Sequence, residues 1–151
     1  MTIPQWVLLG FCAWTLAILI ATIGIYRWSR ILSGQARISE WRADERQGSD
    51  WYNRAMRAHA NCVENLPVYA AIVLCATATR VDGSLLDMLA LTLLGARIAQ
   101  SMTHLSFPQT DGVVSVRFTF FSVQVLCKFV MGVIVAISAL GESTAAAAAI
   151  L

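Results

Sequence analysis

Charged residues are scarce in this sequence. Only 13% of its 151 residues are Asp, Glu, Lys or Arg, whereas 58% are hydrophobic, and ordinary soluble domains carry about 25% charged residues. This scarcity argues against a soluble domain and predicts an integral membrane protein forming one domain over residues 1–151. The formal net charge of +2 is too small to indicate a nucleic-acid-binding surface. The expected environment is therefore a lipid bilayer, with no nucleic acid as partner.

Paired metal-binding or redox cysteines are also lacking. No two cysteines have the C-x-x-C spacing of a metal or disulfide-exchange site, and three of them lie inside apolar runs. We therefore interpret all four as small buried hydrophobic residues and expect no metal site: Cys12, Cys62, Cys75 and Cys127. A removable signal peptide is not expected either, because the first apolar run is too long and an arginine-rich loop follows it.

Long apolar runs dominate what is present. Four of them are long enough to cross a hydrocarbon core of about 30 Å as helices. The predicted fold is an all-α, four-helix membrane bundle. Asp82 and Gly83 mark a tight turn between the second and third runs, which predicts an antiparallel hairpin. The four predicted spans cover residues 4–26, 55–79, 85–105 and 113–140.

Arginine dominates the polar loop between the first two runs, residues 27–54. From Arg27 to Arg57 there are seven arginines and four acidic residues. Because basic loops remain on the cytoplasmic side of a membrane, we expect this loop inside and the N-terminus outside. The membrane is a bacterial inner membrane or an endoplasmic reticulum, between which the sequence does not choose.

Polar side chains recur along one face of each of the last three predicted helices. Offsets of three, four, seven and eleven residues place side chains on a common helix face. Glu64 lies inside a span, where a carboxylate is costly and marks a functional site with a partner. The three polar stripes are Arg57, Asn61 and Glu64; Arg97, Gln100, Ser101 and His104; and Arg117, Gln124 and Lys128.

Alternating spans would bring most of these stripes to the cytoplasmic end, where we expect them to face inward. In that arrangement the cations outnumber the one carboxylate, that of Glu64. Buried guanidinium groups without a counter-charge favour an anionic ligand. Other interpretations stay open at this point. Arg57 and Glu64 could form a structural ion pair, His104 could be a hydrogen-bonding or a catalytic residue, and Lys128 could pair within the bundle or snorkel towards the membrane surface.

Three segments together resemble the MAPEG family, the membrane-associated proteins of eicosanoid and glutathione metabolism. They are Gly34-Gln35-Ala36-Arg37, the R-A-H-A-N-C-V-E stretch from Arg57 to Glu64, and Arg117 at the head of the fourth span. The resemblance covers nearly the whole chain. It implies a homotrimer of four-helix protomers that binds glutathione between neighbours at the cytoplasmic end.

The resemblance also implies roles for individual residues. Arg117 matches the arginine that stabilises the glutathione thiolate, and Glu64 matches the carboxylate that binds the glutathione amine. Arg97 matches an arginine near the end of the third span. The implied activity is conjugation of glutathione to apolar electrophiles, or reduction of lipid hydroperoxides with it. The implied glutathione-binding set is Arg37, Arg57, Asn61, Glu64, Arg97 and His104.

Some positions depart from the family pattern. Ala60 replaces an arginine and His104 a tyrosine of some relatives, while Phe118 and Phe121 replace a serine and a tyrosine. These changes argue against prostaglandin isomerase chemistry. Two alternatives to a glutathione transferase follow: a non-enzymatic protein that presents lipids, and an enzyme that uses another anionic thiol.

Overall fold

All regular secondary structure is helical over the residues described in this computed structural model, 1–41 and 48–148, with side chains described as far as Gly141. No strand occurs in that part of the chain, which confirms the all-α prediction. The elements in order are α1 (Ile3–Ile18), the π-helix η1 (Leu19–Gly24), α2 (Ile25–Leu32), the 3-10 helix η2 (Ile38–Glu40), α3 (Asp50–Ala78), α4 (Ser84–Ser106) and α5 (Asp111–Ala148).

Four helical stretches are long and apolar enough to cross a membrane, as predicted: Ile3–Leu32, Asp50–Ala78, Ser84–Ser106 and Asp111–Gly141. Each extends beyond the predicted apolar run at one or both ends. The first continues to Leu32 and the second begins at Asp50, because a helix can extend through charged residues once it leaves the hydrocarbon. Apolarity had therefore located the membrane crossings but not the helix ends.

The first span is a continuous helix with a π-helical segment, η1. There the Thr22 hydroxyl donates a hydrogen bond to the Ile18 carbonyl at 2.5 Å. Beyond η1, Arg27 of α2 donates to the Tyr52 hydroxyl of α3 at 2.6 Å, and its guanidinium lies 5.3 Å from the Trp41 ring centroid. These contacts fasten α2 to the first turns of α3.

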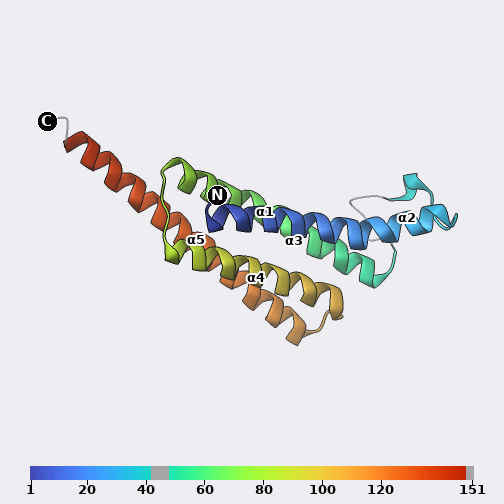
Figure 1. Cartoon of the computed structure of the whole chain (residues 1–151). Coiled ribbons are helices and arrows are strands. Elements are labelled where there is room, and N and C mark those ends of the chain that lie inside the picture. Colours follow the sequence, from blue (N-terminus) through green and yellow to red (C-terminus); the bar gives the residue numbers. More distant parts are fainter. Residues whose placement is uncertain (42–47, 149–151) are drawn as a thin grey trace.

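The predicted tight turn joins α3 to α4. The Val81 amide donates to the Ala76 carbonyl at 2.9 Å, and Arg80 and Gly83 adopt positive φ values of 54° and 141°. Figure 1 shows α3 from teal to green and α4 from yellow-green to gold, with α5 lying along α4 over part of its length and projecting beyond the bundle towards the C-terminus.

The core lies where α1, α3, α4 and α5 meet. Phe11 of α1 packs against Tyr69 of α3, with ring centroids 6.3 Å apart, and the Tyr69 hydroxyl donates to the Pro4 carbonyl at 3.0 Å. Leu93 and Met131 fill the same cluster from α4 and α5. Many large apolar side chains point outward instead, as a surface in contact with lipid requires; they include Trp6, Leu74, Leu126 and Phe129.

Candidate functional site

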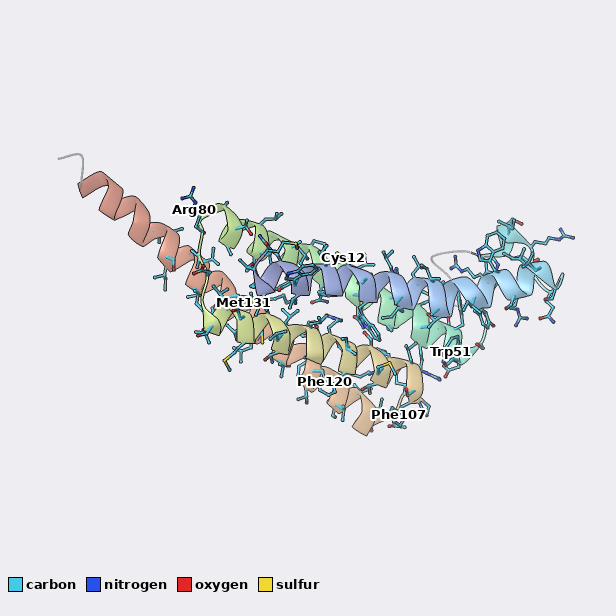
Figure 2. The ribbon with its side chains drawn as sticks, viewed as in Figure 1. Cys12, Trp51, Arg80, Phe107, Phe120 and Met131 are labelled. Atoms are coloured by element: carbon cyan, nitrogen blue, oxygen red, sulfur yellow. The ribbon has the colours of Figure 1, made fainter. Side chains whose placement is uncertain are left out.

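A buried polar cluster joins α3, α4 and α5 in the half of the bundle that contains the α4–α5 turn. Figure 2 shows Phe107 in that turn, at the end of the molecule opposite Arg80. Buried polar and charged side chains in a membrane span are costly unless they satisfy one another. The side chains of the cluster are Asn61, Arg97, Gln100, His104, Arg117 and Gln124.

His104 bridges the other two helices from α4. Its Nδ1 lies 2.9 Å from Nη1 of Arg117, and its Nε2 lies 3.2 Å from the Asn61 amide. Arginine can only donate hydrogen bonds, so Nδ1 must accept and Nε2 must carry the proton of a neutral imidazole. The Asn61 group that faces Nε2 is therefore its carbonyl oxygen, an orientation that hydrogen-bonding logic assigns. His104 thus connects α3 to the guanidinium on α5.

Gln100 lies one turn before His104 on α4 and joins two arginines. Its Oε1 accepts from Arg97 Nη1 at 3.0 Å and from Gln124 Nε2 at 3.1 Å. Its Nε2 donates to the backbone carbonyl of Arg117 at 3.3 Å. The amide therefore ties the turn of α5 that carries Arg117 to the interior of the bundle.

Arg97 is fully buried, with none of its surface exposed. Its guanidinium lies 5.5 Å from the Phe11 ring centroid, a distance at which the ring face attracts a cation. Nε and Nη2 have no hydrogen-bond partner among the described residues, although the guanidinium charge interacts electrostatically with Glu64. Arg97 is joined to the backbone of Arg117 through hydrogen bonds of Gln100, so it contributes to the site indirectly.

The α3 stripe behaves differently from our expectation. Arg57 and Glu64 are exposed on the outer face of α3, and only Asn61, which is half-buried, turns towards His104. The prediction that all three stripes face inward is thus wrong for these two residues in the single chain. The periodicity was right about their common face, but apolar packing against α1 and α4 takes the opposite face, which carries Ala58, Cys62 and Tyr69.

Neither Arg57 nor Glu64 forms an ion pair with the other or with another described residue. The alternative of a structural pair between them is therefore not realised in the described part of the chain. Arg57 still acts electrostatically on His104 and Arg117. Arg37 lies before η2 and is exposed, and no contact joins it to the polar cluster within the described residues. Arg37, Arg57 and Glu64 are thus available to a ligand or a neighbouring chain.

Lys128 pairs inside the bundle, one of the outcomes left open from sequence. Its Nζ donates to Oδ1 of Asn65 at 2.5 Å, and the Asn65 amide donates to the Asn61 carbonyl at 2.8 Å. The sequence analysis missed Asn65. The available signal was its offset of four residues from Asn61, which places both side chains on neighbouring positions of one helix face.

Replacing Asn65 with leucine should destabilise the protein more than replacing Lys128 with methionine. Losing Asn65 leaves a buried cation unpaired, which costs about 3 kcal/mol, whereas losing Lys128 leaves one amide oxygen unsatisfied, about 1 kcal/mol. The double variant should recover most of the difference in stability between the two single variants. Thermal unfolding in detergent measures all three, and equal loss in the two single variants would contradict the pairing.

Two aromatic residues that replace polar ones in some relatives point outward from α5. Phe118 is 67% exposed and Phe121 is 36% exposed, so neither reaches the polar cluster in the single chain. Both follow Arg117 within about one helix turn and give that turn of α5 an apolar outer surface. No group of three His, Cys, Asp or Glu able to hold a metal lies within the described residues.

The fold and the cluster together define a class of protein: a four-span, all-helical membrane protein with an arginine-rich polar site between its helices. The sequence model of the MAPEG family matches residues 6–137, most of the chain. The chain therefore belongs to the MAPEG family, membrane proteins of eicosanoid and glutathione metabolism. No curated protein and no solved structure matches it.

Proposed function

We propose that this protein is a membrane-embedded glutathione transferase or peroxidase that activates the glutathione thiol with Arg117. The observation that carries the proposal is the placement of Arg117, whose guanidinium is bound on one side by His104 and whose backbone is bound by Gln100. Arg117 is only partly buried, so part of its side chain remains open to a ligand. A fixed guanidinium with donors to spare is suited to bind an anion.

The charge balance of the cluster supports an anionic ligand. The charges of Arg57, Arg97 and Arg117 all act on His104. The carboxylate of Glu64 acts on Arg97. Excess positive charge in a membrane interior is expensive without a counter-charge. Glutathione would supply two carboxylates and a thiolate to the arginines and an amine to Glu64.

Activation follows from electrostatics. A cation beside a thiol stabilises the thiolate and lowers the thiol pKa from about 8.5, so more of the nucleophile is present at neutral pH. The thiol proton leaves to solvent. In conjugation, the thiolate sulfur bonds to the electrophilic carbon and the leaving group departs as an anion. In peroxide reduction, the sulfur bonds to the terminal peroxide oxygen and the O–O bond breaks; the alkoxide takes a proton from water, and a second glutathione converts the sulfenic acid to glutathione disulfide and water. Phe118 and Phe121, exposed beside Arg117, would border the path by which such a substrate leaves the bilayer.

The exposed residues indicate that one chain does not complete the site. Arg37, Arg57 and Glu64 are exposed, and charged groups that stay in contact with water on one side contribute little to the affinity for an anion. We infer that a neighbouring protomer supplies the opposite wall, in a homotrimer with its sites between chains. Because arginine-rich loops stay on the cytoplasmic side, the proposal puts these sites at the cytoplasmic end of the membrane and the N-terminus outside.

Titration of glutathione into the detergent-purified protein tests the proposal directly. Bound thiolate absorbs near 240 nm, so saturating glutathione should raise the absorbance at pH values well below the pKa of free glutathione. A calorimetric titration of the same sample measures binding independently. Absence of binding would exclude glutathione and favour the alternative of another anionic thiol, which the same two measurements with other thiols would identify.

A second function is favoured by the outward aromatic side chains. Phe118 and Phe121 give the Arg117 region an apolar outer surface that could hold a lipid for presentation without chemistry. In that case glutathione binding, if present, would give neither thiolate absorbance nor turnover of a model electrophile such as 1-chloro-2,4-dinitrobenzene. The combination of the two signals therefore separates the enzyme from the lipid-presenting protein.

A further inference from the structure

Gln100 lies between the buried guanidinium of Arg97 and the helix turn of Arg117. It is 5% exposed, and it takes part in three hydrogen bonds to α4 and α5 side chains or backbone. No step of the proposed reaction uses it. A buried amide in a membrane span is expensive unless it is satisfied, so its contacts call for an explanation.

The orientation of the Gln100 amide is fixed by its partners. Arg97 has only donors, so the atom that faces its Nη1 must be the carbonyl oxygen Oε1. Nε2 is then directed at the Arg117 carbonyl, which a flipped amide could not bind. An interior carbonyl of a helix already accepts one bond from the residue four positions later, and its second lone pair accepts the bond from Gln100.

Gln124 holds Gln100 in this position. Its Nε2 donates to Oε1 of Gln100 at 3.1 Å and to the Phe120 carbonyl at 2.9 Å, and the side chain is 1% exposed. Both glutamines therefore join α4 to the same part of α5, the turns that contain Arg117 and Phe120. Two amides joined by a hydrogen bond fix relative helix positions more tightly than apolar packing alone.

We propose that Gln100 is a positioning residue for Arg117, an inference that rests on the proposed thiolate-stabilising role of Arg117. His104 holds the guanidinium and Gln100 holds the backbone, so the cation is fixed at two points. Preorganised charge stabilises an anion without a reorganisation cost. A displacement of about 1 Å at a reacting group can lower the rate by about 100-fold, so the backbone contact affects activation.

Two substitutions of Gln100 separate its hydrogen bonds. Gln100→Glu keeps an acceptor for Arg97 and Gln124 but loses the donor to the Arg117 carbonyl. Gln100→Met keeps the length of the side chain, loses all of these bonds and adds no charge. We expect both variants to bind glutathione within about threefold of the unsubstituted protein. Thiolate absorbance should require a higher pH, and kcat should fall about tenfold with little change in KM.

Gln5→Met is the matched control. Gln5 donates to Thr77, near the end of α3 that adjoins the Arg80 turn, so its loss should change neither the pH profile nor kcat. A merely structural role of Gln100 would lower thermal stability and leave the pH profile of the folded fraction unchanged, and that result would overturn the proposal. The Glu variant keeps the test available if the Met variant fails to fold.

Hydrogen exchange of the α5 amides gives a readout that does not depend on glutathione. Loss of the Gln100 donor should speed exchange in peptides that contain residues 113–121 and leave peptides of α1 unchanged. If the unsubstituted protein shows no thiolate signal, the proposed function fails, and exchange then decides whether Gln100 positions this turn. Unchanged exchange in both Gln100 variants would refute the positioning role, whatever glutathione does.

Discussion

Replacing Arg117 with alanine should remove the thiolate absorbance of bound glutathione and lower kcat by about 100-fold to 1000-fold, the loss typical of one preorganised donor to a developing anion. Arg117 is the cation fixed by His104 through a contact of 2.9 Å. Without it the thiol pKa should return towards about 8.5. Binding of glutathione should weaken less, because its carboxylates and amine have other partners in the proposed site.

Arg117→Lys and Arg80→Ala are the informative controls. Lysine keeps a charge but loses the planar fork, so it should bind the thiolate without also holding His104 and should give an intermediate thiolate signal. Arg80 is exposed at the other end of the bundle, so its loss should have no effect on absorbance or kcat. A full thiolate signal in Arg117→Ala would transfer the activating role to another cation, with Arg57 the first to test.

The sequence predicted the helices well because a membrane span requires an uninterrupted apolar run. It did not predict their ends. Residues 27–32 carry the first helix past its apolar run, and Asp50 begins α3 after the Ser49 cap, whose hydroxyl accepts from the Tyr52 amide. Polar residues at a membrane surface are compatible with helix and loop alike, so hydropathy could not distinguish them.

The site was predictable in part for a similar reason. Helical period and membrane depth brought His104 and Arg117 to the same level, and the structure joins them directly. Helical periodicity groups residues on one face but does not say which neighbouring helix that face contacts. The sequence therefore did not predict that Arg57 and Glu64 face outward. Asn65 was missed because a single asparagine inside an apolar run has many structural uses, and only its contact with Lys128 defines this one.

The candidate site residues thus form two layers, of which the inner one lies next to Arg117. This inner layer of Gln100, His104 and Gln124 is joined by hydrogen bonds within one chain and fixes the cation. An outer layer of Arg37, Arg57 and Glu64 is exposed. Charged side chains on the lipid-facing side of a monomer would be costly, so the outer layer is the part that a second chain should cover.

Mixing two inactive variants in one assembly should restore activity if each site combines residues of two chains. We expect Arg37→Ala and Glu64→Gln each to lose most glutathione binding, because each removes a charged contact of the ligand. In a site between chains, Arg37 comes from one protomer and Glu64 from its neighbour. Coexpression of the two variants in equal amounts should then restore about a quarter of the sites, the fraction in which both contributing residues are unsubstituted.

A site within one chain cannot show this recovery, because every chain in the mixture carries one defect. Mixing separately purified, non-exchanging assemblies is the control and should give no recovery either. Light scattering in detergent should report three chains per particle in both samples, which excludes a difference in assembly as the cause. Failure of the coexpressed sample to recover, with each variant folded and trimeric, would place Arg37 and Glu64 in the same protomer's site or exclude Arg37 from it. Recovery would show that Glu64, which forms no ion pair in the described part of one chain, shares its site with the loop of the next.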